Sequence, residues 1–170
     1  MKRKRNKKSS LVGDYVRSSF FGIEDSLVST TGLIAGVSVA TTDKHFIIVA
    51  GIVAIAVEAI SMAAGEFLSE ETEKDLGSSS RRTNPIIGGF IMLVSYFAAG
   101  LIPLTPVLLL PAEYSLPASI AAAFVGLFCL GYVRGKVTGK SPAASAVKVL
   151  VVGGIATMIG IAVGIFFRTP

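Results

Sequence analysis

Five long hydrophobic runs, separated by short polar segments, organise the chain. Each run is close to the roughly 20 residues that an α-helix needs to cross a bilayer. The polar segments between them place the spans at residues 18–42, 45–68, 86–110, 116–133 and 146–167. The pattern predicts an all-α integral membrane protein with five transmembrane helices. We expect these spans to form a single domain, residues 18–170, preceded by a basic segment, residues 1–17.

Prolines and glycines add two local expectations. Four prolines lie between residues 103 and 117, so we expect a kink or an early end of the third helix there. Small residues recur four apart as GxxxG motifs at Gly32 with Gly36 and at Gly160 with Gly164. Such motifs allow two helices to approach closely.

Composition excludes a soluble domain. Hydrophobic residues make up 52% of the chain and Trp is absent, and the mean hydropathy is +0.70. Such a chain is too apolar to present a wet surface on all sides. The one cysteine, Cys129, allows neither a disulfide within the chain nor a cysteine-based metal site.

The position of the basic residues predicts an orientation. Of the sixteen Lys and Arg residues, all except Lys44 and Arg168 lie on one side of the predicted spans. They lie before the first span, between the second and third, and between the fourth span and the start of the fifth, which includes Lys148. The positive-inside rule then places the N-terminus in the cytoplasm and the C-terminus outside. Because topology accounts for the basic residues, the net charge of +5 does not indicate a nucleic-acid partner.

Three acidic residues and a methionine inside the first two spans are the candidate site: Asp25, Glu58, Met62 and Glu66. A charge within a bilayer costs roughly 2.5–3.5 kcal/mol on insertion scales and persists mainly where it binds something. Glu58, Met62 and Glu66 recur every fourth residue and share one helix face. Asp25 and Met62 lie roughly 10 Å and 9 Å from the cytoplasmic ends of their spans, which makes them level in an antiparallel hairpin.

Carboxylate oxygens with a thioether suit a divalent transition ion such as Fe²⁺, Mn²⁺, Co²⁺ or Zn²⁺. One chain supplies few ligands, but a homodimer would duplicate them on the two-fold axis. Because carboxylates must lose a proton to bind a metal, the same groups could exchange protons for metal ions. Glu58 would bind the ion or carry the proton, and Glu66 would guide the ion from the cytoplasm.

Two motifs resemble the vacuolar iron transporter family, also called the yeast calcium-cross-complementing type. They are DSLVSTTGLIAGV at residues 25–37 and AISMAAGEFLSEETEKD at residues 59–75. GLIPLTPVLLL, residues 100–110, also looks like the third helix of that family. The resemblance implies a five-helix homodimer with a path at the two-fold interface. It also implies export of Fe²⁺ or Mn²⁺ from the cytoplasm in exchange for protons, with Asp25 and Met62 on the path.

The chain departs from the family pattern in two places. Plant-type members carry a cytoplasmic metal-binding domain where this chain has only residues 69–84, so it resembles a short form. Glu66, Glu70 and Glu73 would be a remnant of the entrance to that domain. Some members also have an acidic residue at the position of Ala54, which Glu58 would replace here.

Two alternatives stay open at this point: a passive divalent-cation channel, and a membrane scaffold in which the acids only join helices. An enzyme is not expected, because the spans contain no pairing of His with Ser or Cys. No resident cofactor is expected either, since the metal would be the transported substrate. The protein would lie in the plasma membrane of a prokaryote or in a vacuolar or other organelle membrane of a eukaryote.

Overall fold

The computed structural model describes residues 2–76 and 83–168, and its regular elements in these ranges are all helices. The five helices are α1 (Lys2–Ala40), α2 (Lys44–Asp75), α3 (Pro85–Leu109), α4 (Ala112–Val137) and α5 (Pro142–Phe166). The all-α prediction is therefore confirmed. The basic segment is continuous with the first helix, because α1 already begins at Lys2. Between α2 and α3 only residues 76–84 intervene, which leaves no room for a cytoplasmic domain.

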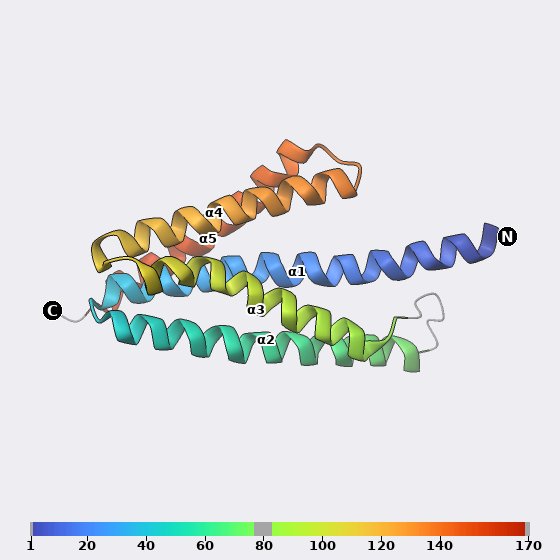
Figure 1. The fold of residues 1–170 in the computed structure, drawn as a ribbon, viewed down its shortest axis with the longest axis horizontal. Helices are drawn as coiled ribbons and strands as arrows, with labels where there is room; N and C mark the ends of the chain where they lie inside the picture. Colours follow the sequence, from blue (N-terminus) through green and yellow to red (C-terminus); the bar gives the residue numbers. More distant parts are fainter. Residues whose placement is uncertain (1, 77–82, 169–170) are drawn as a thin grey trace.

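The helices form an elongated antiparallel bundle with α1 in its middle (Figure 1). Helices α2 and α3 lie on one side of α1, and α4 and α5 on the other, and α1 contacts all four. One buried cluster joins Ile34 of α1 to Ile55 and Leu104. A second joins Leu27 of α1 to Leu127 and Val149. Because α1 contributes to both clusters, it is the element around which the other helices pack.

Four helices, α2 to α5, are long and apolar enough to cross a membrane. Their large apolar side chains are extensively exposed, as expected for surfaces that face lipid rather than water. Within the described residues α1 does not meet the same measure, because polar side chains, including Glu24 and Asp25, interrupt its apolar run. The protein is thus a multi-pass membrane protein in which the most polar helix lies at the centre.

The helix boundaries differ from the predicted spans near the prolines. Helix α3 continues through Pro103 and Pro106 to Leu109, and α4 begins at Ala112 and contains Pro117. Of the two alternatives expected at these prolines, a kink or an early end of α3, the early end is therefore wrong. A proline removes one backbone hydrogen bond from a helix, and neighbouring helices compensate for this loss in membrane proteins. Pro103 is fully buried against such neighbours.

The two GxxxG motifs pack against each other within one chain. A Cβ atom added to Gly36 would lie 2.7 Å from the carbonyl oxygen of Gly160. One added to Gly160 or Gly164 would meet the carbonyl oxygen of Gly32 or Gly36, respectively, at 2.1 Å. No side chain fits in these gaps, so the glycines are what allow the backbones of α1 and α5 to touch.

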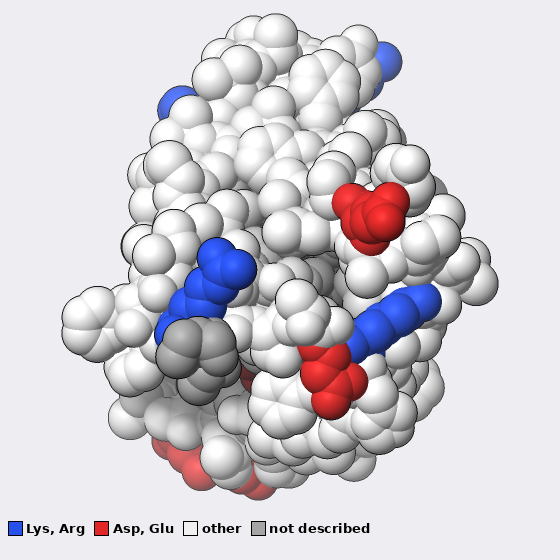
Figure 2. Space-filling model, turned by 90° about the vertical axis from the view of Figure 1, so that its left-hand side faces the viewer, with Lys and Arg blue, Asp and Glu red and all other residues white. Residues whose placement is uncertain are grey.

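The end of the bundle where α1 joins α2 carries few charges (Figure 2). Asp43 ends this connection and Lys44 begins α2, and the Asp43 carboxylate caps α2 by accepting hydrogen bonds from two backbone amides. The Lys44 ammonium donates to the carbonyl oxygens of Leu108 and Leu110 at the end of α3. Asp43 therefore satisfies amide groups at the start of α2, and Lys44 satisfies carbonyl groups at the end of α3.

Candidate metal-transport site

Glu58 is the centre of a polar cluster inside the bundle. Its Oε2 atom accepts a hydrogen bond from the Ser29 hydroxyl at 3.0 Å and another from the Tyr96 hydroxyl. The Ser29 and Tyr96 hydroxyl oxygens are themselves 2.6 Å apart. Helices α1, α2 and α3 each contribute one side chain, so the carboxylate of Glu58 is held in a defined position among apolar helices.

Tyr96 is the residue that the sequence analysis missed. It is fully buried, and the backbone carbonyl of the same residue accepts a hydrogen bond of 2.6 Å from the Ser26 hydroxyl. The sequence does contain a feature that could have indicated this role: Tyr96 lies in the middle of an apolar run, and a buried phenol normally requires a polar partner. Its partner could not be identified without the packing of α3 on α2.

Asp25 and Met62 lie in the same layer of the bundle. Two contacts between α1 and α2 bracket them: the Ser18 hydroxyl bonds to Glu66, and the Ser29 hydroxyl bonds to Glu58. Asp25 lies between the two serines on α1, and Met62 lies midway between the two glutamates on α2. Both side chains are half-buried. The carboxylate of Asp25 is also close enough to those of Glu58 and Glu24 to interact with them electrostatically.

Glu66 lies at the other end of this row, toward the start of α1. Besides accepting the hydrogen bond from Ser18, its Oε1 atom lies 3.8 Å from the Arg17 guanidinium. On the opposite side of α1, the Arg134 guanidinium of α4 donates to Glu24 at 2.9 Å. Neither pairing was expected from the sequence, where both arginines served only to indicate topology.

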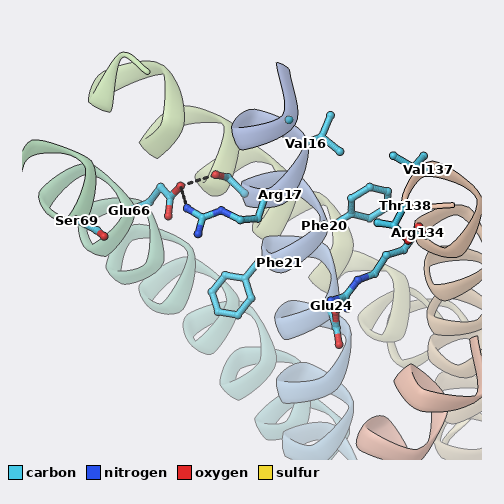
Figure 3. A pocket seen from close by; sticks show the side chains of 12 residues that line it. Val16, Arg17, Phe20, Phe21, Glu24, Glu66, Ser69, Arg134, Val137 and Thr138 are labelled. Carbon is cyan, nitrogen blue, oxygen red and sulfur yellow. Dashed lines mark hydrogen bonds and ion pairs between the residues drawn. The ribbon is translucent and has the colours of Figure 1, made fainter. Parts of the chain in front are cut away.

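These four charged residues line one pocket, which we call the amino-terminal pocket. It has a volume of about 580 Å³ and is lined by α1, α2 and α4. Figure 3 shows Glu66 and Glu24 on two sides of the pocket, with the ring of Phe21 between them and the ring of Phe20 beside Val137 and Thr138. The pocket therefore combines apolar walls with a carboxylate on each side.

Glu70 and Glu73 do not belong to the described lining of this pocket. The Glu70 carboxylate is buried against the first turn of α3, where a Cβ atom on Gly88 would meet its oxygens at 2.9 and 3.0 Å. It lies next to Thr83, which donates a hydrogen bond to it. Glu70 thus packs α2 on α3.

One chain provides an incomplete set of acidic ligands. Across the residues that the structure describes, no three His, Cys, Asp or Glu side chains are grouped so that they could hold a metal ion. The carboxylates of Asp25 and Glu58, the thioether of Met62 and two hydroxyl groups are what the middle of the bundle offers. Such a donor set fits a transition metal ion only if further ligands join it.

Comparison with known proteins identifies the family of this chain. A sequence model of the VIT family matches residues 16–84 and 74–165. Vacuolar iron transporter 1 of Tulipa gesneriana is 24% identical over 206 residues, covering 85% of this chain and 83% of that protein. Vacuolar iron transporter 1 of Arabidopsis thaliana is 24% identical with the same two coverages. Vacuolar iron transporter homolog 2 of Oryza sativa subsp. japonica is 26% identical, covering 91% of this chain and 92% of that protein. The resemblance inferred from the two motifs is confirmed, and the chain belongs to the VIT family.

Proposed function

We propose that the protein transports a divalent transition metal ion, Fe²⁺ or Mn²⁺, out of the cytoplasm. The observation that carries this proposal is the layer formed by Asp25, Glu58 and Met62 within a membrane bundle. Acidic groups at this depth are costly unless they bind a cation or a proton. Membership of the VIT family and similarity to proteins named vacuolar iron transporters support iron as a substrate.

The donor atoms support a transition ion over a harder one. Carboxylate oxygens alone would suit Ca²⁺ or Mg²⁺, whereas a thioether favours a softer ion. Asp25 and Met62 would bind the ion during its passage, and Glu66 would collect it at the amino-terminal pocket. The basic residues near that pocket support a cytoplasmic location for this end.

We assign proton exchange to Glu58, as a proposal that follows from its hydrogen bonds. The hydroxyls of Ser29 and Tyr96 both donate a hydrogen bond to the Glu58 carboxylate and hold it in position inside the bundle. When a metal ion leaves, a proton can replace it on Glu58 or Asp25, because a carboxylate binds one or the other. Return of that proton to the cytoplasm would complete an antiport cycle.

A homodimer would complete the coordination sphere. Helix α2 packs mainly on α3, and α1 packs mainly on α5 and α3. Because α1 and α2 contact each other little, the side of the bundle between them has room for a further helix. Ser29 also lines an apolar groove of about 520 Å³ between α1 and α5. A second copy on this side would cover α1, make it a fifth spanning helix enclosed by protein, and double the number of ligands.

The test is Fe²⁺ and Mn²⁺ uptake into proteoliposomes with an imposed pH gradient and a record of internal pH. We expect metal influx coupled to proton efflux, abolished in Asp25→Asn and reduced in Met62→Ala. Met158→Ala is the matched control, because Met158 lies on α5 and is 63% exposed. Metal flux without proton movement would favour a channel. No flux of any divalent ion through a folded dimer would favour a scaffold.

A further inference from the structure

The amino-terminal pocket is bordered by two ion pairs on opposite sides of α1. Arg17 and Glu66 join α1 to α2, and Arg134 and Glu24 join α4 to α1. Figure 3 shows both arginine side chains extending along the pocket toward the carboxylate of their partner. Each acidic group that an incoming ion would meet in the pocket is thus already paired with a cation of the protein itself.

In both ion pairs the arginine side chain is more exposed to solvent than the glutamate side chain. The Arg17 side chain is 58% exposed, whereas that of Glu66 is 12% exposed. The corresponding values are 49% for Arg134 and 23% for Glu24. In both pairs the guanidinium therefore lies nearer the solvent and the carboxylate lies deeper. A cation that approaches from solvent meets the two positive groups first.

We propose that Arg17 and Arg134 are tethered cations that occupy Glu66 and Glu24 until a divalent ion displaces them, and that they thereby set the affinity of the pocket for that ion. This inference rests on the proposed transport function, because it assigns a new role to the entrance of the same path. It makes the two arginines determinants of ion selection, since a divalent ion is attracted to a carboxylate more strongly than a monovalent ion and so displaces the guanidinium more readily.

The strength of the pairs is compatible with displacement. Pairs with an exposed guanidinium are weak, so an arginine can be exchanged for an ion without a large penalty. The contact between Arg17 and Glu66 is also long, at 3.8 Å. The Ser18 hydroxyl holds the Glu66 carboxylate independently of the arginine. Glu66 therefore keeps its orientation when Arg17 moves away.

The experiment is a calorimetric titration of the purified full chain with Mn²⁺, which requires no transport. Arg17→Gln and Arg134→Gln remove the positive charge and keep side-chain amide donors. We expect each variant to bind Mn²⁺ roughly two- to fivefold more tightly, the range that a weak ion pair allows. Because the pairs share no residue, the double variant should gain roughly the product of the two factors.

Two controls separate this role from a general charge effect. Lys136→Gln changes the net charge equally, but the Lys136 ammonium lies over the Tyr132 ring and outside the pocket lining, so Mn²⁺ affinity should stay at the wild-type value. Arg17→Lys and Arg134→Lys keep the charge and should also bind like the wild type.

The inference is overturned if the Gln variants bind Mn²⁺ no more tightly than Lys136→Gln. It is also overturned if they bind more weakly, because the arginines would then only hold the carboxylates in place. The result is separable from the proposed function. Wild-type protein that transports metal while the Gln variants match the control would refute only the role of the arginines. Wild-type protein that transports nothing would refute the function instead.

Discussion

Gly160 allows a quantitative test of the contact between α1 and α5. A Cβ atom at this position would lie 2.1 Å from the carbonyl oxygen of Gly32 and 2.8 Å from its carbonyl carbon. Ordinary contact begins at 3.4 Å, so Gly160→Ala requires the two backbones to separate by about 1.3 Å. A backbone carbonyl in a helix cannot rotate away, and overpacking of this kind costs about 1–3 kcal/mol.

The assay is thermal unfolding of the purified protein in detergent, followed by circular dichroism. We expect Tm to fall, since each kcal/mol lowers it by about 2–4 °C in a chain of this size. The gain in helix propensity from Gly to Ala, about 0.5–1 kcal/mol, offsets part of the loss. A variant with the same gain and no clash is therefore needed for comparison.

Gly154→Ala is that comparison. Gly154 lies on the same helix, and a Cβ atom there would meet only the tip of the Phe124 ring, at 3.8 Å. Its Tm should equal or exceed that of the wild type. If Gly160→Ala melts at the same temperature as Gly154→Ala or above it, the close contact between α1 and α5 is not what holds these helices together.

Three further substitutions test individual contacts. Tyr96→Phe removes one of the donors to Glu58, a hydrogen bond to a charged group worth about 1.5–3 kcal/mol; metal uptake should slow markedly, and unchanged uptake would exclude Tyr96 from the path. Lys44→Met removes the ammonium that closes the end of α3; stability should fall by about 1 kcal/mol, and an unaltered Tm would show that the contact contributes nothing. Asn84→Ala removes the side chain that caps the start of α3, at a cost of about 0.5–2 kcal/mol; hydrogen exchange in the first turn of α3 should accelerate, and equal protection in both proteins would refute the cap.

Some of the candidate site followed from the sequence because it depends on helix geometry alone. Because Glu58, Met62 and Glu66 are spaced four residues apart, their side chains lie on one face of α2, whatever surrounds that helix. The tight connection after residue 40 makes α1 and α2 antiparallel, so Asp25 and Met62 had to fall at similar depth. The early end of α3 that the prolines suggested does not occur, because Pro103 is buried among neighbouring helices, which an isolated helix would lack.

The sequence by itself determined the helical class, the membrane environment and the residues available for binding metal, because hydropathy and a period of 3.6 residues are local properties. The tertiary structure alone decided which groups meet. Tyr96 reaches Glu58 across 38 positions, and Arg134 reaches Glu24 across 110. Periodicity assigns a side chain to a face of its helix, but its partner depends on the neighbour that packs against that face and on the register between them. For α1 and α5, the register is the one in which the two GxxxG motifs of the same chain pack against each other.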